Sequence, residues 1–297
     1  MKRTLCFTNP AYLSVSKNQL VVKYQDKDEV KRVPIEDVGV IVLEHSQITI
    51  THGLMSHLLG NNVALITSDD HHLPQGMLLN LNGHSEQQER FSVQINATKS
   101  MKDLFWKQTI KRKIMNQALV LKANGIAADN MVYWFKKVDS GDSKNLEARA
   151  AAYYWQKLFV DHIQSFRRGR FGEAPNNLLN YGYAILRGII ARALVSSGLL
   201  PTLGYHHHNK YNAYCLADDV MEPYRPYIDQ MVLELVRNDD NYEELTPELK
   251  KKLLMISSID IKMKNQSRPL MLAVQQTTSS LYKCYERSEK IIIFPEM

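Results

Sequence analysis

The sequence is poor in cysteine. Its three cysteines, Cys6, Cys215 and Cys284, are odd in number and lie far apart in the chain. This spacing argues against a disulfide framework and against a zinc ribbon, because both need closely grouped cysteines. Unpaired thiols are typical of a reducing compartment, so we expect a cytoplasmic protein.

Long apolar runs and several catalytic patterns are also missing. No stretch combines the length and hydrophobicity of a membrane-spanning helix, and the apolar residues behind the basic start end at Asn9-Pro10, which makes a poor signal peptide. We therefore expect no membrane partner. No glycine-rich loop matches a nucleotide cradle, and no serine or cysteine has the histidine and aspartate arrangement of covalent catalysis.

What is present is a long chain with a modest excess of positive charge. Its 297 residues exceed what one core usually holds, so we expect two domains. The formal net charge of +6 suits a nucleic-acid partner, although many proteins without one share it.

Residues 1–84 have the pattern of a β-rich domain. Apolar and polar residues alternate on both sides of a turn at Lys17-Asn18, and the apolar run 38–43 predicts a strand buried on both faces. A short helix is expected within 53–60, and further strands near 48–50, 63–66 and 77–81. Short strands at close spacing predict a small sandwich or barrel-like domain, which ends in the turn-rich stretch 80–85.

Residues 85–297 change to a helical period. Candidate helices cover roughly 86–100, 102–122, 125–138, 144–162, 176–197, 217–237 and 267–288. Ser267 is the expected N-cap of the last one, with Pro269 in its first turn, and 291–294 is expected to be a strand or a docking tail. The predicted fold class is α+β, with a small β-rich, sandwich-like N-terminal domain and a larger all-α C-terminal domain.

Two segments contain the residue types of a metal-dependent active site. The first, 145–155, is rich in alanine and predicts a helix with Glu147 in its first turn. The small residues beside Glu147 would let another helix or a phosphate approach closely. Taken alone, the segment is explained more simply by a packed helix whose Glu147 interacts with the helix dipole.

The second segment places His206, His207 and His208 before an acidic helix start. Asp219 and Glu222 are three residues apart and share a helix face, whereas Asp218 is a natural N-cap candidate. The proline that follows Glu222 implies a kink, or a helix that only begins there. A capped acidic turn beside a solvated histidine cluster explains this segment equally well when it is taken alone.

The donor chemistry indicates what these residues could hold. One imidazole with carboxylates suits Mg²⁺ or Mn²⁺ better than structural zinc. Such a site polarises a phosphoryl oxygen, orients the attacking hydroxyl and neutralises charge on the leaving oxygen. The candidate ligands are distant in sequence, so spacing alone does not establish that they converge.

Four motifs follow one another along the chain. Glu-Ala-Arg-Ala-Ala-Ala-Tyr-Tyr-Trp occupies 147–155, Leu-Asn-Tyr-Gly-Tyr-Ala-Ile-Leu occupies 179–186, the histidine and Asp-x-x-Glu motifs occupy 204–226, and Arg-Pro-Leu-Met-Leu-Ala-Val-Gln occupies 268–275. In content and order they resemble the CRISPR-associated adaptation endonuclease and integrase family, the first of the two proteins common to nearly all CRISPR systems, in its type II-like branch. The resemblance covers nearly the whole chain, and the ordered combination is specific.

The resemblance implies a β-rich N-terminal dimerisation domain over 1–84 and an α-helical catalytic, metal- and DNA-binding domain over 85–297. It implies a homodimer, and a heterohexamer-like complex in which two dimers flank a dimer of the second CRISPR adaptation protein. That complex would hold a short DNA duplex and insert it into the CRISPR repeat array. The reaction would be attack of a 3′-hydroxyl on a phosphodiester, without ATP.

The resemblance also assigns residues to the site. Carried over by motif, Glu147, His207 and Glu222 are the metal ligands, for Mg²⁺ or Mn²⁺, and all three are catalytic, with Asp219 as a supporting catalytic residue. His207 is chosen because it lies 15 residues before Glu222, as in related type II sequences. The histidines on either side of it leave the choice among the three open.

Two basic clusters are candidates for a DNA surface, because DNA carries dense phosphate charge. Residues 99–115 have one acid, Asp103, against six basic residues, namely Lys99, Lys102, Lys107, Lys111, Arg112 and Lys113. Of these, Lys107 and Lys111 share a helix face. The second cluster, Arg167, Arg168 and Arg170, is interleaved with Phe166 and Phe171, whose rings could stack on splayed bases. If the protein does not bind DNA, each cluster is explained as an ordinary solvated surface.

Two other functions stay open at the level of sequence. An integrase of the same fold could serve a mobile element, and the genes beside it would then lack a repeat array. Alternatively, the chain could be a non-catalytic DNA-binding scaffold whose acids only cap helices. That scaffold would bind DNA even when divalent metal is removed.

Overall fold

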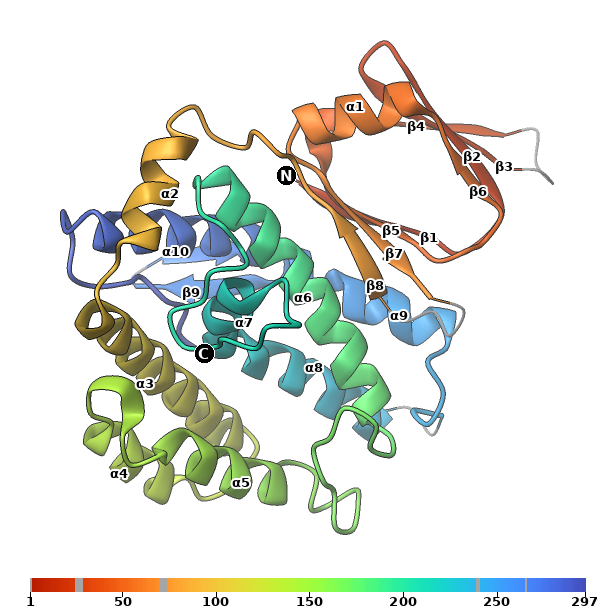
Figure 1. Cartoon of the computed structure of the whole chain (residues 1–297). Helices are drawn as coiled ribbons and strands as arrows, with labels where there is room; N and C mark the ends of the chain where they lie inside the picture. Colours follow the sequence, from red (N-terminus) through yellow and green to blue (C-terminus); the bar gives the residue numbers. More distant parts are fainter. Residues whose placement is uncertain (1, 25–28, 70–73, 239–240, 265) are drawn as a thin grey trace.

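The computed structural model describes residues 2–24, 29–69, 74–238, 241–264 and 266–297. Figure 1 shows a β-rich region at one end of the molecule and a larger body of helices beside it. The N-terminal part of the chain forms the first and the remainder forms the second. The predicted α+β class, with a β-rich N-terminal and a helical C-terminal region, is confirmed.

Two four-stranded sheets make up the β-rich region. One has the order β1-β5-β7-β8, with the first three strands parallel and β8 antiparallel to β7, and the other has the order β4-β3-β2-β6. Helix α1 (His52–Gly60) connects the second sheet to the first. The strands are β1 Arg3–Phe7, β2 Ala11–Ser16, β3 Gln19–Tyr24, β4 Val30–Pro34, β5 Val38–Leu43, β6 Ile48–Ile50, β7 Ala64–Ser68 and β8 Pro74–Leu78.

The hairpin between β2 and β3 forms as its sequence predicts. Lys17 and Asn18 both have positive φ, of 49° and 58°, which is the conformation that two-residue hairpin turns use. Strands β1 and β4 were not predicted, and β8 ends at Leu78 where the sequence predicted 77–81. All three are edge strands, so they are held largely by backbone pairing and carry a weaker apolar signal.

Strand β5 is buried on both faces, which confirms the prediction from its apolar run. Val38 and Ile41 pack into the core between the two sheets, whereas Val40 and Val42 pack into the core of the helical region. The first sheet therefore contributes to two cores, and it contacts α6 directly. The predicted division at residues 84 and 85 falls between β8 and α2, and it stays a prediction.

The helical region is organised around α6 (Asn176–Ser196), which is buried along most of its length. Contrary to expectation, α6 is long and apolar enough to cross a membrane, but 78% of that window is buried inside the protein, as in the core helix of a globular fold. The other helices are α2 Gln87–Ile95, α3 Lys99–Ala123, α4 Asp129–Lys137, α5 Leu146–Leu158, α7 Cys215–Met221, α8 Arg225–Asn238, α9 Pro247–Leu254 and α10 Leu270–Tyr285.

The predicted start of the last helix was wrong. Ser267 and Pro269 lie in strand β10 (Gln266–Pro269), which pairs antiparallel with β9 (Asp260–Met263), and α10 begins only at Leu270. Ser267 is therefore not an N-cap. Backbone pairing with β9 takes up the segment that the sequence pattern assigned to a first helical turn.

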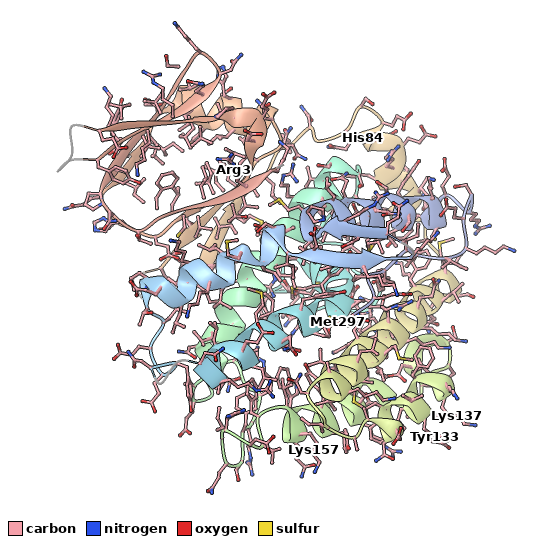
Figure 2. The ribbon with its side chains drawn as sticks, turned by 180° about the vertical axis from the view of Figure 1, so that it is seen from behind. Arg3, His84, Tyr133, Lys137, Lys157 and Met297 are labelled. Carbon is pink, nitrogen blue, oxygen red and sulfur yellow. The ribbon has the colours of Figure 1, made fainter. Side chains whose placement is uncertain are left out.

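The C-terminal segment is a docking tail, one of its two predicted forms. Asn116 of α3 donates from Nδ2 to the Pro295 carbonyl at 3.2 Å and accepts from the Met297 N–H at 3.3 Å. Figure 2 shows Met297 among the helices rather than at the edge of the molecule. The tail consequently rests on the helix that also contributes to the site described next.

Candidate active site

Glu147 is fixed at the start of α5 by a carboxylate that the sequence analysis missed. Asp142 accepts from the Leu146 N–H at 3.0 Å and from the Glu147 N–H at 2.9 Å. Asn145, which directly precedes the helix, has a left-handed conformation and makes no side-chain cap bond. Asp142 thus satisfies the free N–H groups of the first turn, and Glu147 lies in that turn as predicted.

Glu222 stands at a break between two helices. The predicted helix 217–237 is divided into α7 and α8 by the 3₁₀ turn Glu222–Tyr224, which agrees with the kink expected from Pro223. Asn116 donates to the Pro223 carbonyl at 2.8 Å, so α3 holds this turn in place. Arg225 Nη2 lies 3.1 Å from Glu222 Oε1, and only 6% of the Glu222 side chain is exposed.

Lys113 of α3 lies between the two glutamates. Its Nζ is 2.5 Å from Glu147 Oε1 and 2.6 Å from Glu222 Oε2. The prediction that Lys113 belongs to a basic surface cluster is wrong, because only 9% of its side chain is exposed. The missed signal was its phase, since Lys113 follows the buried Thr109 and Ile110 at helical spacing.

Opposite charges determine the protonation states of this group. Burial alone would raise the pKa of Glu222, but Arg225 and Lys113 outweigh it and lower that pKa to about 2. Burial alone would lower the pKa of Lys113, but Glu222 and Glu147 outweigh it and raise that pKa. Glu222 therefore stays ionised opposite Lys113 and Arg225.

His207 is oriented by Asp219, which is fully buried in α7. Asp219 accepts the backbone N–H groups of Tyr205, His206 and His207 at 2.7, 2.9 and 3.1 Å, and its Oδ1 lies 2.6 Å from His207 Nδ1. The hydrogen bond to Asp219 raises the pKa of His207. A carboxylate can only accept, so Nδ1 carries the proton and Nε2 is left with a lone pair when the ring is neutral, as in metal-binding histidines.

The two neighbouring histidines are held differently. His206 stacks on Trp106 with ring centroids 3.6 Å apart and planes 2° apart, and burial lowers its pKa. His208 lies with its ring 6.5 Å from that of His206. Within the described chain, His207 is the one of the three with a carboxylate against its ring nitrogen, so the geometry favours His207 as the ligand.

Asp218 is not an N-cap, which corrects the sequence analysis. Helix α7 begins at Cys215, so Asp218 lies inside its first turn. Its carboxylate accepts two bonds from Arg187, at 2.7 and 3.1 Å, and one from Asn212 at 2.7 Å. Asp218 therefore ties α6 and the preceding loop to α7 and takes no part in the group around Lys113.

The donor set fits a divalent cation, although not without movement. Glu147 and Glu222 meet across Lys113, and the charge of Glu222 is close enough to help raise the pKa of His207. Among the described residues, no three His, Cys, Asp or Glu side chains are grouped closely enough to hold a metal as they stand. Glu222 Oε2 contacts the ammonium of Lys113 but has no partner in hydrogen-bonding geometry, so this buried oxygen suits a cation.

The lysine face of α3 is smaller than the sequence suggests. Three of its six basic residues have acidic partners, namely Lys99, Arg112 and Lys113. Lys107 and Lys111 are half-buried along the helix, and Lys111 Nζ lies 4.8 Å from the ring of Phe135. The part of this cluster that stays a candidate DNA surface therefore centres on Lys107 and Lys111.

The arginine cluster lies in the loop after α5, and its members have different roles. Arg168 donates to the Gly169 carbonyl, to Asn176 and to Asn180, each at 2.8 Å, so it holds the loop against α6. Arg167 and Arg170 are exposed. Their guanidinium groups are consequently the ones better placed to contact phosphate.

The two phenylalanines of this loop differ as well. Phe171 is 94% exposed, as a base-stacking ring would need to be. Phe166 packs against Trp155 and Phe159, with ring centroids 5.8 and 4.7 Å apart, so its half-buried ring is less accessible to a base than that of Phe171. Its ring anchors the loop to α5.

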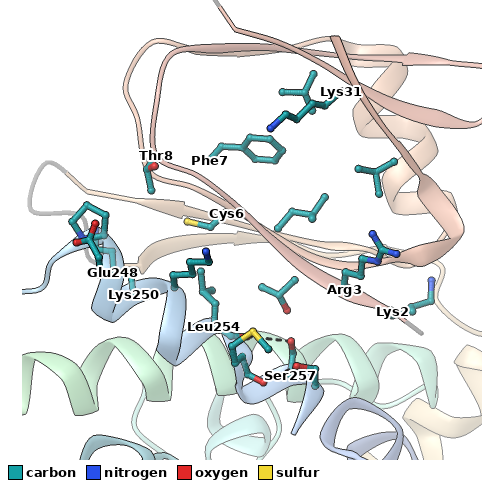
Figure 3. Close-up of a pocket in the computed structure, with 18 of the residues that line it drawn as sticks. Lys2, Arg3, Cys6, Phe7, Thr8, Lys31, Glu248, Lys250, Leu254 and Ser257 are labelled. Carbon is teal, nitrogen blue, oxygen red and sulfur yellow. Dashed lines mark hydrogen bonds between the residues drawn. The ribbon is translucent and has the colours of Figure 1, made fainter. Parts of the chain in front are cut away.

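A cavity of about 760 Å³ lies away from these residues, where the N-terminal strands meet α9 and the turn that follows it (Figure 3). Strands β1, β3 and β4 and helix α9 line it, with Phe7 and Leu254 on its apolar surface and Arg3 and Lys31 among its basic residues. None of the acids or histidines of the candidate site belongs to its lining. The candidate site is therefore separate from this cavity.

Comparisons with known sequences agree with the motif resemblance. The model of the family described as CRISPR associated protein Cas1 matches residues 5–255. The CRISPR-associated endonuclease Cas1 of Neisseria meningitidis serogroup C (strain 8013) is 34% identical to this chain, over 99% of this chain and 96% of the relative.

Solved structures share the fold. A casposase bound to its integration product has a TM-score of 0.81 at 18% identity, covering 98% of this chain and 92% of the casposase. A Cas6-RT-Cas1–Cas2 complex has a TM-score of 0.76 at 18% identity, covering 97% of this chain and 35% of the matched chain. With the family match over most of its length and this shared architecture, the chain belongs to the CRISPR associated protein Cas1 family.

Proposed function

We propose that this protein is a metal-dependent DNA endonuclease and integrase of CRISPR adaptation, which inserts short duplex DNA into the CRISPR array. The observation that carries the proposal is the meeting of Glu147 and Glu222 across Lys113, with His207 held nearby by Asp219. The endonuclease name of the Neisseria relative supports DNA cleavage. The casposase bound to an integration product supports strand transfer on this fold.

Glu147, Glu222 and His207 are the residues that would hold Mg²⁺ or Mn²⁺. When bound, the ion supplies a Lewis acid for a phosphoryl oxygen and offsets the negative charge that develops during the reaction. The protein's own contribution is positioning. Asp142 fixes the backbone of Glu147, and Asp219 fixes the ring of His207 with Nε2 available.

The proposed reaction exchanges one phosphodiester for another. The 3′-hydroxyl of the incoming strand gives up its proton and forms a new P–O bond to the target phosphorus. The bond from that phosphorus to the target's own 3′-oxygen breaks, and this oxygen takes up a proton. No bond energy has to be supplied from outside, so ATP is not needed, and water in place of the hydroxyl gives endonuclease cleavage.

The proposed partners follow from the surface and from the related assemblies. DNA would contact Arg167 and Arg170 of the loop and Lys107 and Lys111 of α3, with Arg168 holding the loop in shape. A homodimer, paired through residues 1–84, and a complex with the second adaptation protein are proposed by analogy with the Cas1–Cas2 assembly of similar fold. The free thiols of Cys6, Cys215 and Cys284 support a reducing, cytoplasmic location.

The test is strand transfer of a short 3′-hydroxyl duplex into a plasmid that carries repeats, with the second adaptation protein and Mn²⁺ or Mg²⁺. Glu222→Ala should reduce the product to background, and chelation should do the same to the parent protein. Glu234→Ala, on the exposed side of the neighbouring α8, is the matched control and should retain parent activity. Full activity in Glu222→Ala would contradict the proposed site.

Two alternative functions predict different experimental results. One alternative is an integrase of the same fold that serves a mobile element. A gene neighbourhood that lacks both a repeat array and a second adaptation gene would support that alternative. A non-catalytic scaffold would bind DNA in the presence of chelator and give no strand-transfer product under any metal condition.

A further inference from the structure

The carboxylates proposed to bind a metal already share a cation supplied by the chain itself. Lys113 Nζ contacts an oxygen of Glu147 and an oxygen of Glu222 at 2.5 and 2.6 Å. The lysine is buried, and α3 is fixed around it by the bonds of Asn116 to the Pro223 turn and to the C-terminal tail. The ammonium is consequently held at this position by the fold.

The charge balance of the group sets a condition for metal binding. Lys113 and Arg225 already balance the charges of Glu147 and Glu222. Like charges repel more strongly inside a protein than in water, so a divalent ion beside an unmoved ammonium is disfavoured. The ammonium and the ion need the same oxygens, so one must withdraw when the other binds.

We propose that Lys113 is an internal counter-ion of the metal site, which holds Glu147 and Glu222 together in the metal-free protein and competes with a divalent cation for their oxygens. This inference rests on the proposed function, since it concerns the same site. Lys113 is thus a positioning residue whose ammonium lowers the affinity for the metal. In return, the two acids are held close together before the ion arrives.

If Lys113 formed a purely structural ion pair, removal of its charge would change the affinity for the metal in the opposite direction. If Lys113 only holds the acids in place, its loss lets Glu147 and Glu222 separate, and the affinity for the metal falls. If the ammonium competes, its loss frees Glu222 Oε2 and removes the repulsion, and the affinity rises. The sign of the change in affinity therefore separates the two roles.

The experiment measures Mn²⁺ binding to the full chain without DNA, by the electron paramagnetic resonance signal of free Mn²⁺. Lys113→Met should bind Mn²⁺ at least about tenfold more tightly than the parent, since tenfold corresponds to only about 1.4 kcal/mol. Lys113→Arg keeps the charge and should stay within about threefold of the parent. Lys122→Met, an exposed position on the same helix, is the matched control and should leave the affinity unchanged.

Thermal unfolding provides a second readout that does not depend on activity. Lys113→Met should melt below the parent in chelator and gain more from saturating Mn²⁺ than the parent does, because the ion then supplies the missing charge. If Lys113→Met does not fold, Lys113→Gln carries the same two predictions. Equal or weaker Mn²⁺ binding in a folded, uncharged variant overturns the inference.

The two proposals can fail separately. Tighter binding in Lys113→Met without strand transfer by the parent protein contradicts the proposed function and leaves the counter-ion role intact. Strand transfer that depends on Glu222, with no gain of affinity in Lys113→Met, contradicts only the counter-ion role. Absence of Mn²⁺ binding in the parent and in both uncharged variants overturns both.

Discussion

The two halves of the candidate site are built in different ways. In the acid half, Glu147 and Glu222 lie at helix ends that pack on α3, which carries Lys113, and their charges are balanced within the protein. The histidine half, formed by His207 and Asp219, is a loop whose backbone is bound by one buried carboxylate. The difference indicates that helix packing holds the acids, whereas the Asp219 carboxylate and the Trp106 ring position the imidazole.

A large loss of strand transfer is expected from removing the buried carboxylate that binds the backbone of the histidine half. Asp219→Asn replaces one acceptor oxygen by an N–H₂ donor that faces other N–H donors, so the loop loses bonds and His207 loses its orientation. We expect strand transfer to fall about 100-fold and the free energy of unfolding to fall by about 2 kcal/mol. Integration assays and urea denaturation measure the two effects.

The neighbouring acid is the control for that substitution. Asp218→Asn makes the same chemical change, but its partner Arg187 has a side chain that is 38% exposed. The Asp218 carboxylate is itself only 8% exposed, so this change should also cost about 1–2 kcal/mol of unfolding free energy. Strand transfer should fall much less than in Asp219→Asn, because the ring of His207 is bonded by Asp219. Parent activity in Asp219→Asn would show that the histidine loop keeps its shape without this carboxylate.

Opposite dependences on pH should separate the two halves in metal-free protein. Glu222 has a lowered pKa, of about 2, so its contribution to stability is complete above its unfolded value, near 4.5, and is lost as the pH falls toward 2. His207 has a raised pKa, so its contribution is complete below about 6.5 and is lost as the pH rises through its folded value. Denaturation of Glu222→Gln and His207→Asn against the parent, in chelator, measures both contributions.

The expected loss of unfolding free energy is larger for the acid half. Glu222→Gln leaves Lys113 and Arg225 with reduced compensation inside the protein, so it should cost about 3 kcal/mol near neutral pH. His207→Asn should cost less, because 40% of the His207 side chain is exposed. If both differences changed with pH in the same direction, the two halves would not be electrostatically distinct.

The smallest expected effect concerns the basic surfaces beside each half. The arginine loop follows α5, which carries Glu147, whereas Lys107 is next to Trp106, the residue that stacks on His206. Replacing Arg167 and Arg170 by alanine should reduce the slope of log affinity against log salt by about 0.9 for each phosphate contact that is lost. Replacing Lys107 and Lys111 tests the other surface in the same DNA-binding titration.

The two pairs distinguish the direction from which DNA approaches. Equal reductions indicate DNA that spans both halves of the site, and a reduction in one pair indicates approach from that side. If the slope of log affinity against log salt is unchanged in both double variants, both clusters are ordinary solvated surface. Arg168 is omitted from the test, because its loss would also release the loop from Asn176 and Asn180.

Local patterns in the sequence predicted the local features of the fold. The helix start that carries Glu147, the break at Pro223, the turn at Lys17 and the doubly buried β5 each depend on a few consecutive residues. The β9–β10 hairpin escaped prediction because its pairing competes with the helix signal of 267–288.

The acids and His207 were named by motif, and their partners were not. The structure was needed to identify the roles of Lys113, Asp142 and Arg225. Each of them contacts a site residue that lies in another part of the chain or in another element. A lysine within a basic run is naturally predicted to be exposed. Only its helical spacing from the buried residues of α3 indicates that it is buried. Asp142 caps a helix that begins four residues later, which a search for a cap directly before the helix passes over.

A crystal structure of the protein in saturating Mn²⁺, with anomalous scattering from manganese, tests the central claim most directly. We expect one or more manganese peaks in contact with carboxylate oxygens of Glu147 and Glu222 and with His207 Nε2, and we expect Lys113 Nζ to be withdrawn from Glu222. A crystal with no manganese peak at these side chains, and with Lys113 still bridging the two acids, would contradict it.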